Sequence, residues 1–244
     1  MISLLMCSRA KGNKNHGLKR FLESLYAQSH SWDNFEVLIK IDEDDDEFDF
    51  NVLKNWPFQI KHIVSGRGRG YEDLHIGYKQ IFNMIDKRSV MVGCVADDFT
   101  VLTPYWDVVL LRKVNEIKGN IFIIHSHPVN LDFSFKDMSN VLVDDAPFWS
   151  VHLMNTVDTD WIIYGTDAWT SALEKILKQN GVSISLFTGT TLFQRHSDQS
   201  IDGPEGPRWT NERKRMFEYI ATDEFKQRIT LQATQVMKGE YVFK

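Results

Sequence analysis

Short apolar runs alternate with amphipathic stretches along the first half of the chain. Residues 2–7 and 89–96 are almost continuously apolar, which is typical of strands that are buried on both faces. In residues 15–29 apolar side chains recur every three or four positions, which predicts a helix with one buried face. The alternation predicts an α/β fold with a mainly parallel sheet covered by helices on both faces. The same patterns predict further strands at residues 35–41, 59–64 and 121–125, and further helices at residues 71–86 and 105–117.

The second half of the chain is less regular. Apolar side chains fall on one helical face of residues 165–180, and Gly181 follows as a residue that commonly ends helices. Residues 182–193 have the composition of strands. Residues 126–160 predict loops with short elements.

The length of 244 residues suits one domain with a small addition. Residues 209–236 are charged and mostly helical in pattern. We therefore expect a single domain over residues 1–207 and a C-terminal helical extension over residues 208–244. Hydrophobic residues make up 43% and charged residues 25% of the chain, which is typical of a globular protein and excludes a disordered one.

The sequence has no pattern of a membrane or secreted protein. No apolar run approaches the ~20 residues that a transmembrane helix needs. Basic residues follow the first apolar run at once, unlike the order in a signal peptide. The two cysteines, Cys7 and Cys94, lie inside apolar stretches, which favours buried, reduced thiols. We therefore expect a cytoplasmic protein without a transmembrane segment.

The net charge of −5 is unevenly distributed, because seven of the eight residues from Asp42 to Asp49 are acidic. Without them the chain would be slightly basic, and it has no broad basic region, so we expect no nucleic-acid partner. The acidic run does not match a calcium loop, because Glu47 stands where that loop needs glycine and Leu53 where it needs glutamate. We expect the acids from Asp45 onward to be solvated. Asp42, directly at a strand end, could accept hydrogen bonds from a nucleotide base or ribose.

Polar side chains follow four of the predicted strands. The carboxyl ends of parallel strands meet at one edge of a sheet, and ligands of such sheets bind beyond that edge. These side chains are therefore expected to lie close together. They are Ser8 with Arg9, then Asp42, then residues 65–70, and finally Asp97 with Asp98.

The adjacent acids Asp97 and Asp98 suggest a metal site. Two neighbouring carboxylates repel each other unless a cation or hydrogen-bond donors compensate them. Mg²⁺ and Mn²⁺ prefer oxygen ligands and commonly bridge to substrate phosphates. The alternative is a pair of acids that caps the following turn.

Residues 66–70, Gly-Arg-Gly-Arg-Gly, predict a flexible cationic turn before a helix. Backbone amides, a helix N-terminus and the guanidinium groups of Arg67 and Arg69 suit a phosphate or a planar base. The segment lacks the Walker lysine and does not match the dinucleotide fingerprint. The alternative is a glycine turn with arginines that face solvent.

In this order, the features of residues 1–110 resemble those of glycosyltransferases of the GT-A type, close to family 2. The segment SLLMCSR resembles the first strand and turn of that family, and FLESLYAQSHSWDNFEVLIKIDEDDD resembles its helix, loop and second strand. Residues 67–110 resemble its glycine-rich region, second helix and metal-motif strand. Later, residues 165–169 (GTDAW) resemble the acidic segment that opens a helix and carries the catalytic base, and residues 193–196 (FQRH) resemble a late segment that supplies a histidine.

The resemblance implies a GT-A, Rossmann-like fold with a nucleotide-binding half over residues 1–110 and an acceptor and catalytic half over residues 111–207. The usual Asp-any-Asp motif is here Asp97-Asp98-Phe99, which leaves the metal ligand open by one position, and Thr166 replaces the usual glutamate. The implied site has nucleotide-binding residues Ser8, Arg9, Asp42, Arg67, Arg69 and Asp97, metal ligands Asp98 and His196, and the catalytic base Asp167.

The implied activity is a Mn²⁺- or Mg²⁺-dependent sugar transfer. The donor would be a nucleoside-diphosphate sugar, most readily a UDP-sugar, and the acceptor a hydroxyl group of a glycan or another molecule, with inversion at the anomeric carbon. One alternative is a nucleotidyltransferase, which needs a glycine-rich basic loop after the first strand that residues 11–14 (KGNK) match only partly. The other is a nucleotide- or glycan-binding module without turnover.

Overall fold

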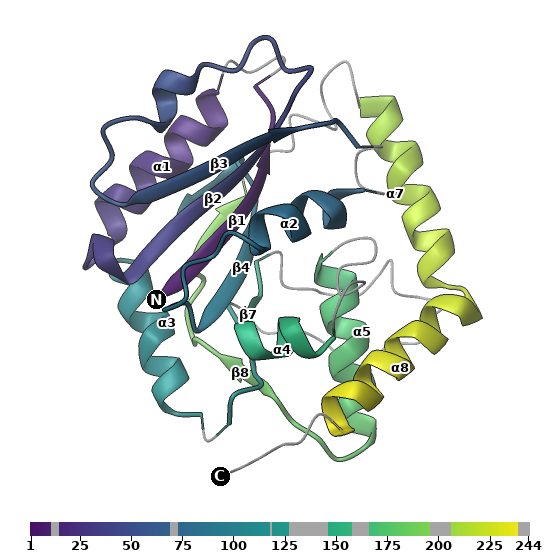
Figure 1. Cartoon of the computed structure of the whole chain (residues 1–244). Coiled ribbons are helices and arrows are strands. Elements are labelled where there is room, and N and C mark those ends of the chain that lie inside the picture. The colour runs from purple at the N-terminus through teal and green to yellow at the C-terminus, as the bar shows by residue number, and fades with distance from the viewer. Residues whose placement is uncertain are drawn as a thin grey trace.

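The computed structural model describes residues 1–10, 15–68, 73–117, 119–126, 146–157, 166–195 and 206–238. Within them, seven strands form a sheet in the order β3-β2-β1-β4-β7-β6-β8 (Figure 1). The strands are β1 (Ile2–Ser8), β2 (Phe35–Asp42), β3 (Gln59–Ser65), β4 (Met91–Val95), β6 (Ile123–His125), β7 (Phe148–Ser150) and β8 (Ser185–Phe187). A small antiparallel sheet joins β5 (Phe99–Val101) to β9 (Phe193–Arg195).

The sheet is mainly parallel, as the apolar runs predicted. β1 pairs in parallel with β2 on one side and with β4 on the other, and β2 pairs in parallel with β3. β7 is antiparallel to both of its neighbours, β4 and β6, and β6 is parallel to β8. The carboxyl ends of β1, β2, β3 and β4 therefore meet at one edge of the sheet, which we call the carboxyl edge.

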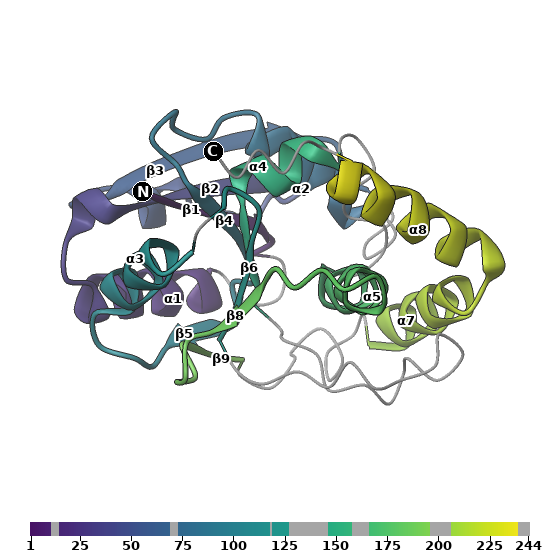
Figure 2. The ribbon, with the colours of Figure 1, turned by 90° about the horizontal axis from the view of Figure 1, so that it is seen from below.

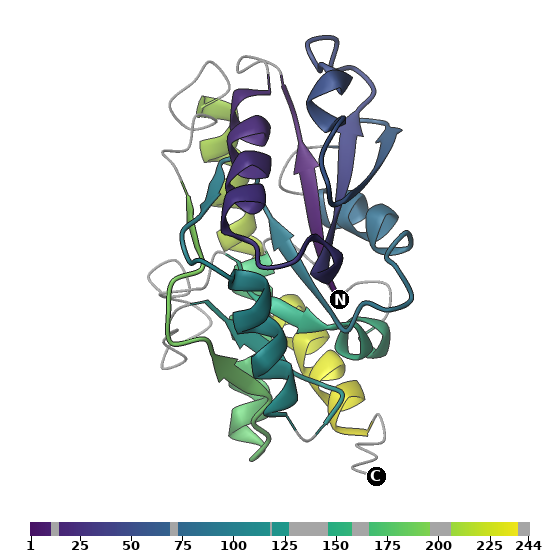
Figure 3. The same cartoon turned by 90° about the vertical axis from the view of Figure 1, so that its left-hand side faces the viewer.

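Helices cover both faces of the sheet. α1 (His16–Gln28) and α3 (Trp106–Asn115) lie on one face, and α2 (Leu74–Phe82) and α4 (Val151–Thr156) lie on the other (Figure 2). α1 and α3 follow one another along their face (Figure 3). The helices and strands confirm the predicted α/β fold, and α1, α2 and α3 fall inside the ranges that the apolar periodicity predicts.

Two hydrophobic cores lie on the two faces of the sheet, because successive side chains of a strand point in opposite directions. In β1, Leu4 and Met6 pack in the core that contains Phe21 of α1. Leu5 packs in the other core, with Tyr78 of α2. β1 is therefore buried on both faces, which explains why its sequence is continuously apolar.

The second core extends to the C-terminal helices α5 (Thr166–Gln179), α7 (Gly206–Ile220) and α8 (Asp223–Lys238). Trp169 of α5 is fully buried, and its indole N–H donates to Oε1 of Gln232 on α8 at 2.8 Å. The helices predicted at residues 209–236 are thus present and share a core with the sheet domain. The boundary between residues 207 and 208 stays a prediction. None of the helices in the described part of the chain combines the length and the apolar character needed to cross a bilayer.

Candidate active site

The end of β1 is joined to the end of β4 by hydrogen bonds. β1 and β4 run in parallel register, with Met6 opposite Val95, so their following residues lie side by side. The hydroxyl of Ser8 donates to Oδ2 of Asp97 at 2.8 Å, and the backbone N–H of Arg9 approaches the same oxygen at 3.4 Å. Two residues that are 89 positions apart in the sequence therefore meet at the carboxyl edge, as the strand pattern predicted.

The side chain of Arg9 crosses from β1 to the end of β2. Its Nη1 lies 3.1 Å from Oδ2 of Asp42 and 3.6 Å from Oδ1 of Asp44. The other carboxylate oxygen of Asp42 accepts a hydrogen bond from Nζ of Lys40, which also donates to the carbonyl oxygen of Gly66 at 3.1 Å. Asp42 thus lies between two cations in a partly buried position, where its negative charge is well compensated.

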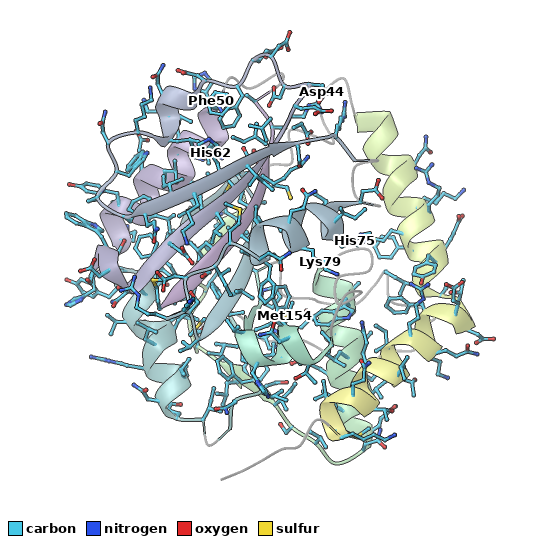
Figure 4. All side chains as sticks on the ribbon, viewed as in Figure 1. Asp44, Phe50, His62, His75, Lys79 and Met154 are labelled. Carbon is cyan, nitrogen blue, oxygen red and sulfur yellow. The ribbon has the colours of Figure 1, made fainter. Side chains whose placement is uncertain are left out.

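Arg67 extends this set of contacts to the end of β3. Its Nη1 lies 3.8 Å from Oδ2 of Asp44, the carboxylate that also faces Arg9. Figure 4 shows Asp44 beyond the carboxyl edge of the sheet. Polar contacts therefore run from Asp97 through Ser8 and Arg9 to the acids that follow β2, and on to Arg67. We call this set the strand-end network.

The turn after β4 is held closely against α1. A Cβ atom at Gly17 would lie 2.7 Å from the carbonyl oxygen of Asp97, so only glycine fits there without a shift. Nη2 of Arg20, one turn further along α1, donates to the carbonyl oxygen of Asp98 at 3.4 Å. Desolvation raises the pKa of the Asp97 carboxyl, and the hydrogen bonds from Ser8 and Arg9 offset part of that shift.

The acidic loop after β2 is not simply solvated. Asp45 is only 8% exposed, and its Oδ2 accepts a hydrogen bond from the backbone N–H of Ala10 at 2.6 Å. The backbone N–H of Asp49 donates to Oδ1 of Asn15 at 2.8 Å. The expectation of a solvated run is therefore wrong for Asp45, because its carboxylate supplies the acceptor that the buried amide after β1 needs. These two bonds fix the loop beside the strand-end network.

Three of the predicted site residues cannot be placed fully. Arg69 and His196 lie outside the described residues. Asp167 is the second residue of α5, and its side chain lies outside the description. The roles expected for these three residues stay predictions.

Two cations at this edge were not among the predicted site residues. Lys40 lies inside β2, and its side chain is 7% exposed. A lysine in an otherwise apolar strand, two positions before an acid, is the signal that could have identified it, because a buried ammonium group needs a partner. Arg20 lies on the polar side of an amphipathic helix, and nothing in its local sequence distinguishes it from a solvent-facing arginine.

The side chains at the carboxyl edge show whether suitable metal ligands are present there. Among the described residues, no group of three or more His, Cys, Asp and Glu side chains is arranged to hold a metal ion. Mg²⁺ bound with a nucleotide commonly takes only one or two carboxylates, and substrate phosphates and water supply the other ligands. The half-buried pair of Asp97 and Asp98 at the end of β4 provides carboxylates of this kind. The residues present therefore fit a hard divalent cation that binds together with a phosphate-bearing ligand.

In comparisons of sequence, no family model and no curated protein matches this chain. Comparison of structures does find matches. The structure of S. aureus TarS 1–349 matches with a TM-score of 0.58 and 12% identity, over 96% of this chain and 70% of that chain. The same fragment in complex with UDP-GlcNAc matches with a TM-score of 0.57 and 12% identity, over 96% of this chain and 71% of that chain.

A different enzyme also matches. 4-Diphosphocytidyl-2C-methyl-D-erythritol synthase from Anaerococcus prevotii has a TM-score of 0.51 and 10% identity, over 86% of this chain and 98% of that chain. At these identities the likeness concerns the fold and not the residues of the site. The resemblance to GT-A-type glycosyltransferases is thus confirmed at the level of the fold.

Proposed function

We propose that the protein is a glycosyltransferase that moves a sugar from a nucleoside-diphosphate sugar, UDP-linked, to a hydroxyl group of a glycan or another acceptor. The observation that carries this proposal is the strand-end network, in which Ser8, Arg9, Asp42, Arg67 and Asp97 come together at the carboxyl edge of a GT-A fold. Ligands of parallel sheets bind at this edge. UDP and UDP-GlcNAc are bound in structures of TarS, which has the same fold.

The network provides both kinds of group that a nucleotide diphosphate needs. Asp42 can accept hydrogen bonds from a base or ribose, because its two oxygens have lone pairs beyond those that Arg9 and Lys40 use. The guanidinium groups of Arg9 and Arg67 can bind the diphosphate, whose charge grows as the bond between sugar and oxygen breaks. Both arginines now face Asp44, whose side chain is 49% exposed. A diphosphate can therefore replace Asp44 as the partner of these two guanidinium groups.

A divalent cation, Mn²⁺ or Mg²⁺, would be held by Asp98, with His196 as a further ligand. Bound there, such an ion stabilises the negative charge of the leaving diphosphate. The removal of the acceptor proton would be the role of a protein residue. Asp167, at the start of α5, would take the proton of the acceptor hydroxyl. A base on the side of the sugar opposite the diphosphate implies a single in-line displacement, and so inversion at the anomeric carbon.

Binding of UDP with and without Mn²⁺, measured by calorimetry, tests the metal and nucleotide parts of the proposal. The wild-type protein should bind UDP more tightly when Mn²⁺ is present, and Asp98→Asn should remove that enhancement. Glu218→Gln, which neutralises an exposed acid on α7, is the matched control and should behave as the wild type. If Asp98→Asn keeps the full enhancement, Asp98 is not the metal ligand.

Release of UDP from UDP-sugars tests the enzymatic part. The wild-type protein with Mn²⁺ should release UDP from at least one UDP-sugar, and faster when the acceptor is present. Asp167→Asn should bind UDP as the wild type does but should not transfer the sugar. Transfer at the wild-type rate by this variant would exclude Asp167 as the base. Metal-enhanced binding of UDP without any turnover would favour a binding module.

A nucleotidyltransferase is the second candidate, because the fold also matches 4-diphosphocytidyl-2C-methyl-D-erythritol synthase over 98% of that chain. The loop that such an activity would need, residues 11–14, lies outside the described residues. Calorimetry with CTP and UTP beside UDP separates the two candidates. Tight binding of a triphosphate, together with weak binding of UDP, would favour the nucleotidyltransferase.

A further inference from the structure

Three aromatic side chains lie together at the edge of the sheet opposite the strand-end network. They are Tyr26 near the end of α1, Trp32 of the 3₁₀ helix η1 (Trp32–Asn34), and Trp56 just before β3. With Asn55 and Pro57 they line an open hollow of about 590 Å³, which is within the range of small-molecule binding sites. We call these five residues the aromatic platform.

Two of the three rings, those of Tyr26 and Trp32, are exposed and nearly parallel. The rings of Tyr26 and Trp32 stack with centroids 5.5 Å apart and an interplanar angle of 14°. Tyr26 is 49% exposed and Trp32 is 43% exposed, so each ring presents a large area to solvent. The ring of Trp56 is tilted against that of Tyr26, with centroids 6.3 Å apart, and forms a second wall of the hollow.

The platform is held in place by contacts to the rest of the fold. The indole N–H of Trp56 donates to the carbonyl oxygen of Val52 at 2.7 Å, which fixes its orientation. Its other side stacks on Phe58, at 5.5 Å between centroids and 23° between planes. Phe58 is 4% exposed and packs against the core residue Phe35 at 5.0 Å. The ring of Trp56 therefore loses little freedom when a ligand binds, which favours binding.

The chemistry of the platform indicates which ligand it fits. None of its five residues is Asp, Glu, Lys, Arg or His, so the lining itself carries no charged group for a phosphate, a nucleotide or a charged peptide. Aromatic faces carry partial negative charge and attract the weakly positive C–H groups on the flat face of a pyranose ring. The exposed amide of Asn55 can both donate to and accept from sugar hydroxyls. We propose that the aromatic platform binds the pyranose rings of a neutral saccharide chain.

The platform is separate from the strand-end network. It lies where β2 and β3 begin, whereas Asp42 and Ser65 mark where the same two strands end. β2 has eight residues, and at ~3.3 Å per residue its two ends are about 23 Å apart. A saccharide on the platform therefore does not occupy the proposed donor site. A chain long enough to span that distance could be held at the platform while its end reaches the carboxyl edge.

Titration with three neutral oligosaccharides, cellohexaose, xylohexaose and chitohexaose, tests the platform without any donor or metal. Calorimetry and tryptophan fluorescence should both report binding of at least one of them. Trp32→Ala and Tyr26→Ala should each weaken that binding about tenfold, which is the scale of one lost aromatic contact. Trp32→Phe, which keeps a ring, should weaken it less than Trp32→Ala. Because no sugar is transferred, this result does not depend on the proposed function.

Phe50→Ala is the matched control, because Phe50 is as exposed as Trp32, at 43%, and does not line the hollow. Its ring lies at a tilt against that of His62 (Figure 4). The Phe50→Ala variant should bind the oligosaccharide as the wild type does. The proposal is wrong if none of the three binds at millimolar concentration, or if Phe50→Ala loses as much affinity as Trp32→Ala. It is also wrong if sedimentation shows a wild-type dimer that Trp32→Ala dissociates, since a second copy of the chain would then cover the platform.

Discussion

Gly17→Ala should loosen the contact between α1 and the turn that carries Asp97 and Asp98. A Cβ atom at this position would lie 2.7 Å from the carbonyl oxygen of Asp97 and 3.4 Å from its carbonyl carbon. Both atoms belong to the backbone, so no side chain can rotate away to relieve the contact. The helix and the turn must separate by roughly 0.7 Å to restore an ordinary van der Waals distance.

The expected loss of stability is the difference between two effects. Overpacking in a closely packed region costs about 2 kcal/mol, within a range of 1–3 kcal/mol. Alanine is favoured over glycine inside a helix by about 1 kcal/mol, which offsets part of that cost. The free energy of unfolding should therefore fall by about 1 kcal/mol, which corresponds to roughly 2–4 °C in the midpoint of thermal unfolding for a chain of this size.

Urea unfolding measures the free energy of unfolding, and calorimetry measures the affinity for UDP in the presence of Mn²⁺. Gly66→Ala is the matched control, because its Cβ would meet only the flexible carboxylate of Glu43 at an ordinary 3.6 Å. That variant should be as stable as the wild type or slightly more stable. Gly17→Ala should unfold at a lower urea concentration and bind UDP more weakly. A variant with the stability of the wild type and unchanged affinity for UDP would refute the packing argument.

Three further predictions concern the core. Gly93→Ala places a Cβ 2.5 Å from the ring of Phe148 on the paired strand, and should lower the free energy of unfolding by about 2 kcal/mol in urea denaturation. Adding Phe148→Leu should recover part of that loss, and a purely additive double variant would contradict the clash. Glu174→Met removes the buried acceptor that lies 2.8 Å from Nε2 of His125, and should cost about 1–3 kcal/mol by the same measurement; an unchanged urea midpoint would be the contrary result. Burial raises the pKa of the Cys7 thiol to about 12. The unfolded chain releases this proton near pH 9 and the folded one does not, so this contribution to stability is complete below pH 9 and is lost as the pH rises from 9 to 12. Urea midpoints should therefore fall less steeply over this range in Cys7→Ala, and equal slopes would contradict the prediction.

Local features of the sequence predicted most of the fold. The continuous apolar run of residues 2–7 identifies β1 as a strand with both faces covered, and the spacing of Leu18, Phe21, Leu22 and Leu25 identifies the buried side of α1. β7 was not predicted as a separate strand, because three residues are too few to establish a period. Its antiparallel direction depends on pairing with β4 and β6, which lie elsewhere in the sequence.

The strand-end network likewise has features that the sequence predicts and others that depend on packing. The strands predicted for a parallel sheet are enough to predict that Ser8, Asp42 and Asp97 lie at one edge, because each directly follows a predicted strand. The pairing of Arg9 with Asp42, the inward turn of Asp45 and the role of Lys40 could not be predicted in this way. Each depends on which donor and acceptor come within about 3 Å of each other after the chain has packed.

The apolar patterns and the positions of the strand ends thus determined the class of the fold and the edge at which the nucleotide site is expected. Both can be read from each segment alone, because the burial of a helix or strand requires a local pattern of apolar residues. The aromatic platform, by contrast, is built from Tyr26, Trp32 and Trp56, which belong to three segments and have no shared pattern. Only the tertiary structure brings their rings together, because contacts between distant segments depend on the packing of helices against the sheet and not on the residues next to them.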